Sequence, residues 1–437
     1  MLRRKIEKQI KEHLETQQDR ILIVEGARQI GKTYIIRYIG KSYKNYVEIN
    51  LLDDFNGQKL FNNTRSVEDF YLQLGALGKQ LGDRSDTLVF LDEIQVYPHL
   101  LTLLKFLNQD PKYTYICSGS LLGVTLARAV SIPIGSTRTI RMYPLDFEEF
   151  LWANGFSDET INTLHKKFDL LETLDEGVHN RMMNLFKRYL LCGGMPAAVV
   201  EFIDSMNITK VRDIQNTIYE YYGLDAVKYD KENKLRSRSV YKYIPSALES
   251  KKKRIFFQDI EQRDGARFAD YRDEFEYLIQ AGIALNVNAI SNPKFPLRES
   301  QSKNLLKLYL NDVGILTSLL YQNNIRAIFD DDTSINLGTV YESVVAQELA
   351  AHSYSLNYYD NKKNGEVDFL IDDFNVLSVV PIEVKSGKDY SVHSALSHFV
   401  GTPDYHIKKA IVLSNNRDIM VRDGITYMPI YFSMFLL

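Results

Sequence analysis

Residues 26–33 have the composition and spacing of a loop that holds a triphosphate. They read Gly-Ala-Arg-Gln-Ile-Gly-Lys-Thr and fit the pattern GxxxxGK(S/T) at every fixed position. A predicted strand precedes them and a predicted helix follows, so free backbone N–H groups point at the β-phosphate. Lys32 would bridge the β- and γ-phosphates, and the Thr33 hydroxyl would bind Mg²⁺. We expect ATP to contact Gly26, Ala27, Arg28, Gln29, Ile30, Gly31, Lys32 and Thr33.

An acidic motif further along the chain supplies the expected partner of this loop. Residues 88–91 are all apolar, and Asp92 and Glu93 follow them directly. Asp92 is expected to hold Mg²⁺, commonly through water, and Glu93 to orient or deprotonate the water that attacks the γ-phosphate. Half of such acidic strand ends have no special role, so this prediction depends on the presence of the loop.

Hydroxyl and arginine side chains would complete the site. Ser118 and Ser120 follow a strand predicted at 113–117 and lie near the γ-phosphate if that strand adjoins the acidic one. They would sense the phosphate, although serines at a turn are also ordinary turn chemistry. An arginine should neutralise the transition state, from this chain or from a neighbouring subunit. The candidates are Arg128, Arg138 and Arg141.

The C-terminal part contains a second group of chemically suited residues. Asp368 lies in an apolar stretch, and Glu383 and Lys385 follow with the spacing E-x-K. Side chains alternate along a strand, so Glu383 and Lys385 face the same side. Asp368 and Glu383 would bind Mg²⁺, while the lysine activates water or stabilises a pentavalent phosphate. The alternatives are an edge strand with solvated charges, an inactive relic, or a site that only grips nucleic acid.

The elements that position the first site alternate short apolar runs with amphipathic stretches, which indicates an α/β fold with a parallel sheet covered by helices. Asp146 is a plausible helix cap after the last of these strands. The predicted strands are 21–24, 46–51, 87–91, 113–117 and 138–142, and the predicted helices include 33–39, 67–77 and 99–107.

Helices dominate from there to about residue 325. A helix at 267–280, a strand at 282–288, a turn at 292–293 and a strand at 305–309 have the order of a winged helix-turn-helix module. Basic residues cluster over 228–254, which predicts a DNA contact if they are not simply solvated. The sequence therefore predicts a mostly helical, winged-helix region after the first domain.

The last part of the chain reads as a third α/β unit. A polar linker at 330–332 precedes it, a helix is predicted at 340–351, and strands are predicted at 366–371, 379–384 and 410–413. The tail from 427 to 437 favours a buried terminal strand. We therefore expect an ATPase domain at 1–155, the helical and winged-helix region at 156–330, and the third domain at 331–437.

Five motifs together resemble the prokaryotic AAA-type ATPases that carry a C-terminal DUF4143 domain. They are the segments 26–33, 91–95, 117–120, 143–150 and 192–196. The resemblance implies an AAA-like P-loop core, a winged-helix middle part and a C-terminal nuclease-like fold. One departure concerns the arginine, because this chain reads Ile-Gly-Ser-Thr-Arg at 134–138 where the family often has a Gly-Arg pair.

The second site likewise resembles the PD-(D/E)xK nuclease superfamily. Glu342 lies on the preceding predicted helix, where that fold often places another acidic ligand. The resemblance implies a third carboxylate beside Asp368 and Glu383. It makes Glu342, Asp368, Glu383 and Lys385 the candidate nuclease residues.

Composition limits the remaining classes of function. A chain of 437 residues exceeds the size of one core, so two or three domains are expected. Two widely spaced cysteines and the lack of an apolar segment of bilayer length favour a soluble protein of the reducing cytoplasm, without a membrane. The net charge of −3 gives no general argument for nucleic acid.

The sequence therefore predicts a Mg²⁺-dependent ATPase that acts with or on DNA. The alternative is a nucleotide-dependent binding or signalling switch without nuclease activity. Protein partners and self-association stay open in either case.

Overall fold

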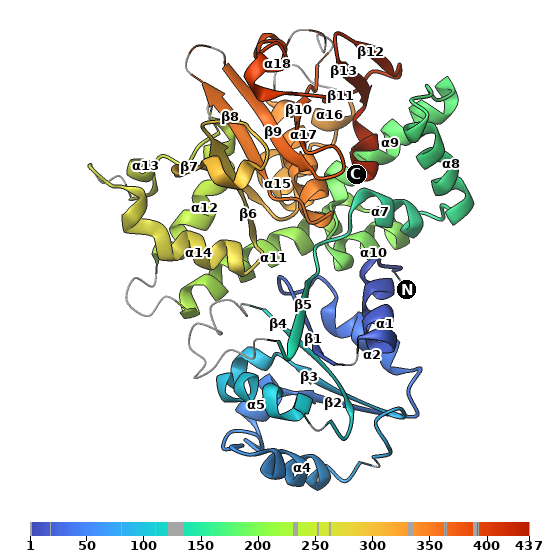
Figure 1. The fold of residues 1–437 in the computed structure, drawn as a ribbon, viewed down its shortest axis with the longest axis vertical. Helices are drawn as coiled ribbons and strands as arrows, with labels where there is room; N and C mark the ends of the chain where they lie inside the picture. The colour runs from blue at the N-terminus through green and yellow to red at the C-terminus, as the bar shows by residue number, and fades with distance from the viewer. Residues whose placement is uncertain are drawn as a thin grey trace. The chain divides into compact units, whose positions relative to one another are not determined.

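The computed structural model divides the chain into two compact units (Figure 1). Apart from the first two residues, the first unit comprises Arg3–Tyr143 with Gln280–Gly282, and the second comprises Pro144–Ile279 with Ile283–Leu437. The described residues are 2–17, 19–79, 81–109, 111–120, 135–229, 235–250, 253–261, 264–330, 335–361, 363, 365–387, 391 and 393–436.

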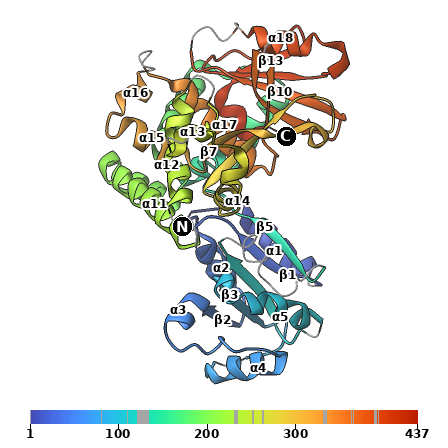
Figure 2. The same ribbon diagram turned by 90° about the vertical axis from the view of Figure 1, so that its left-hand side faces the viewer.

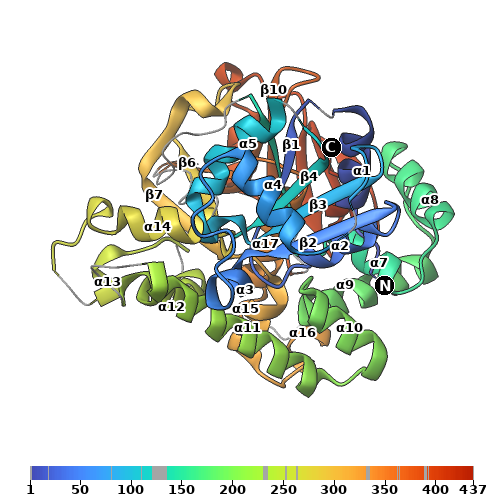
Figure 3. The ribbon, with the colours of Figure 1, turned by 90° about the horizontal axis from the view of Figure 1, so that it is seen from below.

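The first unit is built on a five-stranded sheet in the order β2-β3-β4-β1-β5. All neighbouring strands run parallel, as Figure 3 shows for β2, β3 and β4. β3 and β4 are fully buried, as expected of apolar strands covered on both faces. The strands are β1 (Ile21–Glu25), β2 (Asn45–Asn50), β3 (Thr87–Asp92), β4 (Thr114–Gly119) and β5 (Thr137–Arg141). The predicted parallel sheet is confirmed.

Helices connect these strands, and their apolar sides fill the core. Phe70 and Leu74 of one helix and Leu100 and Leu104 of another pack in one cluster with Leu91 of β3. The helices are α1 (Ile6–Thr16), α2 (Lys32–Gly40), α3 (Leu51–Asn56), α4 (Val67–Ala76) and α5 (Pro98–Gln109), with a short 3-10 helix η1 (Ile94–Val96). The three helices predicted from spacing are therefore present as α2, α4 and α5.

The second unit begins with helices. Asp146 caps the first of them, because its carboxylate accepts from the backbone N–H of Glu149 while Glu149 reaches back to the cap. The α-helices up to the first strand are α7 (Phe147–Ala153), α8 (Asp158–Asp169), α9 (Glu176–Cys192), α10 (Pro196–Ser205), α11 (Ile208–Tyr229), α12 (Arg236–Glu249), α13 (Phe257–Glu261) and α14 (Arg272–Gln280). A 3-10 helix, η2 (Phe268–Tyr271), precedes the last of them.

An eight-stranded mixed sheet follows in the order β12-β13-β11-β10-β9-β8-β6-β7, drawn from yellow to red in Figure 2. Its strands are β6 (Ala284–Ile290), β7 (Gln301–Leu310), β8 (Asn357–Asn361), β9 (Gly365–Asp373), β10 (Ser378–Val384), β11 (Ala410–Ser414), β12 (Met420–Arg422) and β13 (Ile425–Pro429). The remaining helices are α15 (Val313–Tyr321), α16 (Arg326–Phe329), α17 (Leu337–Ala351) and α18 (Ser394–Val400), with 3-10 helices η3 (Leu297–Ser300), η4 (Pro403–Tyr405) and η5 (Ile430–Phe435).

The strand pair expected to form a wing is present, but it is not free-standing. β6 and β7 pair antiparallel, and β6 also pairs in parallel with β8. The hairpin is therefore one end of the large sheet, which joins strands from both sides of residue 330. The polar linker predicted at 330–332 lies largely outside the described residues.

The C-terminal tail differs from the predicted strand. β13 ends at Pro429, and the buried η5 follows. Its apolar residues are buried on every side, with Tyr431 and Phe432 fully covered. Burial was therefore predicted correctly, while continuation of the strand was wrong.

The glycine pair at the end of α9 lies where three segments of the second unit meet. Leu145 donates its backbone N–H to the Gly194 carbonyl at 2.7 Å, and the Gly194 N–H donates to the buried Asp312 carboxylate at 2.6 Å. A Cβ at Gly194 would lie 2.0 Å from the Leu145 carbonyl oxygen. Only glycine fits this close backbone approach.

Gly194→Ala is therefore expected to destabilise the second unit by roughly 3 kcal/mol or more, since main-chain atoms must move to admit the methyl group. Urea denaturation monitored by circular dichroism measures the change. Gly387→Ala is the matched control, because a Cβ there meets no atom within 4 Å. An equal effect of both substitutions would contradict the close approach.

Candidate functional site

The loop after β1 adopts a conformation that needs its glycines. Gly26 has φ 149° and Gly31 has φ 98°, both in the region that favours glycine. A Cβ at Gly26 would lie 2.3 Å from the carbonyl oxygen of Met142. Gly31 is the residue from which α2 begins, so unpaired N–H groups of the first helical turn lie next to the loop. This is the backbone arrangement that binds a phosphate.

Lys32 lies buried within the loop. Its ammonium group donates to the carbonyl oxygens of Gly26 and Ala27, at 2.9 and 2.7 Å. Burial lowers the pKa of Lys32 to about 8, and the carboxylates of Glu93 and Asp92 oppose that shift. A desolvated cation beside free helical N–H groups is suited to an anionic ligand.

The two sequence motifs meet at Thr33 and Asp92. The Thr33 hydroxyl donates to Asp92 Oδ2 at 2.9 Å. Ser118, at the end of the adjoining strand β4, donates its hydroxyl to the other oxygen of the same carboxylate. Burial raises the pKa of Asp92, and the negative charge of Glu93 adds to this effect. A divalent cation here would relieve the cost of the charged carboxylate.

Glu93 and Ser120 are linked through a residue that the sequence reasoning did not single out. Glu93 has φ 58°, and its carboxylate contacts the side-chain amide of Gln95. The same amide nitrogen donates to Ser120 Oγ at 3.2 Å. Gln95 appeared in the sequence only as the end of the motif at 91–95, and no local signal indicates its bond to a serine 25 positions away.

Arg4 is a second residue that sequence reasoning missed. It is buried and donates to the carbonyl oxygens of Ile30, at 3.0 Å, and Tyr143, at 2.6 Å. It therefore ties the N-terminal segment to the phosphate loop. A single arginine near the start of a chain gives no pattern from which this role could be read.

The predicted arginines differ in position. Arg138 pairs in register with Leu22, well before the loop, and its guanidinium donates to Gln17. This makes Arg138 unsuited to the phosphate end of the sheet. Arg141 lies beside Glu25, where β1 meets the loop, and forms an ion pair with it at 2.9 Å. Arg128 lies outside the described residues.

The C-terminal residues predicted to act together lie on β9, on β10, directly after β10 and on α17. Ile382 pairs with Phe369, so Glu383 and Asp368 are the next residues across the two strands and share a face. The backbone N–H of Val384 donates to Asp368 Oδ2 at 2.8 Å. Burial raises the pKa of Asp368 and of Glu383, and the charge of Glu342 raises both further. The three carboxylates singled out from the sequence therefore lie near one another in the structure.

Two of these carboxylates, Glu383 and Glu342, form ion pairs with lysines. Glu383 lies 2.8 Å from the ammonium of Lys385, and Glu342 forms a buried ion pair with Lys253. Tyr309 also donates to Glu342, at 3.1 Å. Across the described part of the chain, no three Asp, Glu, His or Cys side chains form a group that could hold a metal ion. As arranged here, Glu383 and Glu342 each contact a lysine ammonium group.

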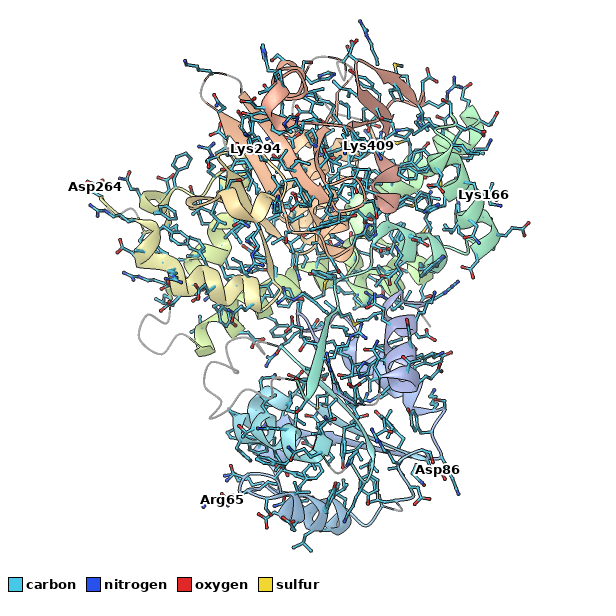
Figure 4. The ribbon with its side chains drawn as sticks, in the orientation of Figure 1. Arg65, Asp86, Lys166, Asp264, Lys294 and Lys409 are labelled. Atoms are coloured by element: carbon cyan, nitrogen blue, oxygen red, sulfur yellow. The ribbon has the colours of Figure 1, made fainter. Side chains whose placement is uncertain are left out.

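The basic residues of 228–254 whose side chains are described all form ion pairs with acidic residues. The ion pairs are Arg236 with Glu261, Arg238 and Lys242 with Glu220, Lys253 with Glu342, and Arg254 with Asp360. The side chains of Lys228, Lys231, Lys234, Lys251 and Lys252 are outside the described residues. Figure 4 shows charged side chains of both signs at the periphery, such as Lys166 and Asp264.

Three family comparisons cover successive parts of the chain. Residues 18–151 match the AAA domain, residues 183–326 match the domain of unknown function DUF8612, and residues 337–432 match the domain of unknown function DUF4143. No curated protein was found to match the chain. In the described residues, no helix has both the length and the apolar character required to cross a bilayer.

Three solved structures are similar to the chain at low sequence identity. The Walker-type ATPase PABY2304 of Pyrococcus abyssi is 14% identical, with 73% of this chain and 96% of that chain covered and a TM-score of 0.44. The S. cerevisiae Hsp104–ADP complex is 12% identical, with coverages of 78% and 56% and a TM-score of 0.31. PCH-2 of C. elegans is 14% identical, with coverages of 49% and 63% and a TM-score of 0.26.

These TM-scores are all below 0.5, so the assignment depends on the family matches and on the site geometry. The AAA match spans the phosphate loop, the acidic strand and the serine strand that meet in the first unit. The chain carries an AAA domain of the P-loop ATPase class, followed by DUF8612 and DUF4143 domains.

Proposed function

We propose that the chain binds ATP with Mg²⁺ at the phosphate loop and hydrolyses the bond to the γ-phosphate. The observation that carries the proposal is the 2.9 Å contact between Thr33 and Asp92, which joins two motifs far apart in the sequence. The donor set fits Mg²⁺, which binds proteins through a hydroxyl and one or two carboxylates and takes its other ligands from phosphate and water. When bound, this ion neutralises charge on the phosphate oxygens.

The chain's own residues supply the remaining steps. The loop amides and Lys32 bind the phosphates, and Lys32 exchanges its two carbonyl acceptors for phosphate oxygens. Glu93 accepts a proton from the attacking water, whose oxygen forms a bond to the γ-phosphorus while the bond to the β-phosphate oxygen breaks. The products are ADP and inorganic phosphate.

Phosphate release by the purified protein tests the proposal. Release is expected with ATP and Mg²⁺, and it should stop when EDTA removes the metal. Thr33→Val keeps the shape of the side chain but removes its hydroxyl, so we expect it to lower kcat about 100-fold. Full activity in EDTA, or in Thr33→Val, would contradict the proposed site.

The low pKa of Lys32 predicts a pH dependence of nucleotide binding. In the free protein Lys32 loses its proton near pH 8, and a bound triphosphate favours the protonated form. Binding above pH 8 is therefore coupled to proton uptake. At pH 9 about one free molecule in ten carries the proton, so the Kd for Mg·ATP should be roughly tenfold higher than at pH 7.

Calorimetric titration at both pH values measures this change. Lys32→Arg is the control, because an arginine stays charged throughout this range. Its Kd is expected to be nearly the same at pH 7 and pH 9. A wild-type Kd that does not change over this interval would show that Lys32 does not titrate on binding.

We also propose that the C-terminal half binds a partner molecule, that this binding depends on the nucleotide held by the first unit, and that this half has no nuclease activity. Support comes from the lysines that neutralise Glu342 and Glu383, and from the ion pairs of the described basic residues. The competing hypothesis, a Mg²⁺-dependent nuclease with a winged-helix DNA contact, is supported by the shared face of Asp368 and Glu383 and by the E-x-K spacing.

DNA assays with the full chain discriminate the two hypotheses. We expect no cutting of single- or double-stranded DNA with Mg²⁺ or Mn²⁺, with or without ATP. Cutting that disappears in Asp368→Ala would overturn the binding role and establish the nuclease. Glu276→Ala is a suitable control, because this exposed residue lies on α14 outside the carboxylate group.

A further inference from the structure

Gln95 is buried in the short turn that follows the acidic strand, and it contacts Glu93 and Ser120. Its side-chain nitrogen bonds the carboxylate of Glu93 and donates to Ser120 Oγ at 3.2 Å. The residue lies in η1, the turn that follows Glu93, while Ser120 directly follows β4. Gln95 therefore connects the water-activating carboxylate to the neighbouring strand.

The orientation of the Gln95 amide follows from its partners. A carboxylate oxygen accepts hydrogen bonds, so the amide nitrogen of Gln95, and not its oxygen, faces Glu93. The two hydrogens on this nitrogen then serve Glu93 and Ser120. The carbonyl oxygen, Oε1, is buried and has no hydrogen-bond partner among the described residues. A buried acceptor of this kind is normally satisfied by a protein donor or a water molecule.

Gln95 is linked to the phosphate end of the site through Glu93. Glu93 directly follows Asp92, which contacts Thr33, and the charge of Glu93 acts on Lys32. Glu93 also has a positive φ of 58°, a conformation that a glutamate rarely adopts and that surrounding contacts must hold. The amide of Gln95 is one such contact.

We propose that Gln95 positions Glu93 for hydrolysis, holding its carboxylate beside Ser120 while the amide oxygen accepts a hydrogen bond from the attacking water. With Glu93 as the second acceptor, the water is held at two points and turns a lone pair toward the γ-phosphate. This inference assumes the ATPase activity proposed above. It assigns a role to the last residue of the 91–95 motif.

Gln95→Leu tests the role, since it nearly keeps the side-chain volume and removes the amide. We expect kcat to fall about 10- to 100-fold, as is typical when a group that orients a reactant is lost, while the Kd for Mg·ATP stays within about twofold. Gln9→Leu, at an exposed position of α1, is the matched control and should leave both values unchanged. A kcat of Gln95→Leu within about twofold of wild type would overturn the proposal.

A double-substitution cycle separates positioning from a merely structural role. If Gln95 acts through Glu93 and its water, then Glu93→Gln with Gln95→Leu should be no slower than Glu93→Gln alone. If the double variant is slower than Glu93→Gln by the same factor that Gln95→Leu causes alone, Gln95 acts independently of Glu93. Gln95→Glu keeps the shape but places a second carboxylate against Glu93, and it should lower kcat at least as much. Gln95→Glu replaces Gln95→Leu in the test if Gln95→Leu does not fold.

The wild-type rate distinguishes failure of the inference from failure of the proposed function. If wild-type protein releases no phosphate from Mg·ATP, the ATPase proposal itself is wrong and the role of Gln95 fails with it. If wild type is active and Gln95→Leu is equally active, only the role of Gln95 is wrong.

Discussion

Lys32→Ala is expected to abolish measurable binding of Mg·ATP, with a Kd at least about 100-fold above that of wild type. The lysine supplies the one fully buried cation of the described loop, and its ammonium group is held by carbonyl oxygens that a phosphate replaces. Loss of a desolvated charge contact of this kind costs about 3 kcal/mol or more, which corresponds to about a 100-fold change in Kd. Calorimetric titration of the purified variant measures the effect.

Lys44→Ala provides the matched control in the same unit. Lys44 is largely exposed, and its nearest acidic partner lies 3.8 Å away, so its removal should leave the Kd unchanged. Denaturation curves of both variants establish that they are folded. Tight binding of nucleotide by folded Lys32→Ala would show that the loop is not the phosphate site.

Glu93→Gln is expected to separate binding from turnover. The amide keeps the size of the side chain but cannot accept a proton from water, so kcat should fall by about 10²- to 10³-fold. The Kd for Mg·ATP should change little, because Glu93 lies outside the loop that binds the phosphates. Single-turnover phosphate release and equilibrium titration measure the two quantities.

Glu68→Gln is the control for the loss of one exposed carboxylate in the same unit, and it should hydrolyse ATP at the wild-type rate. If Glu93→Gln also turned over at that rate, another group would have to accept the proton. If its Kd instead rose together with the loss of kcat, Glu93 would act in binding and not in hydrolysis.

The residues of the first site could be singled out from the sequence because they lie in short contiguous segments. The eight residues of the loop fix both the backbone turn and the groups that it presents, and an apolar strand ending in Asp92 and Glu93 is equally local. The sequence did not show that β3 and β4 are neighbours. The pairing of the two strands in the structure shows it. Gln95 bonds a serine 25 positions away, and Arg4 bonds the carbonyl groups of Ile30 and Tyr143, so no local motif could reveal these contacts.

The C-terminal region was harder to predict because its charged residues and strands pair with partners far away in the sequence. The strand pattern correctly predicted β9, β10 and β11, and alternation placed Glu383 and Lys385 together. Lys253 lies 89 positions from Glu342 and the buried Lys307 lies 59 positions from Glu366, so their ion pairs follow from the fold alone. From the sequence alone, the hairpin of β6 and β7 looked like an isolated wing. Its pairing with β8 is a long-range contact that no local pattern reveals.

A crystal structure of the protein soaked with Mn²⁺ and a non-hydrolysable ATP analogue tests the central claim most directly. Anomalous scattering locates the ion without reference to the protein. The account predicts an ion peak beside Thr33 Oγ1 and the Asp92 carboxylate, with the β-phosphate within hydrogen-bond distance of the loop amides. A nucleotide bound elsewhere, or an ion peak away from Thr33 and Asp92, would contradict it.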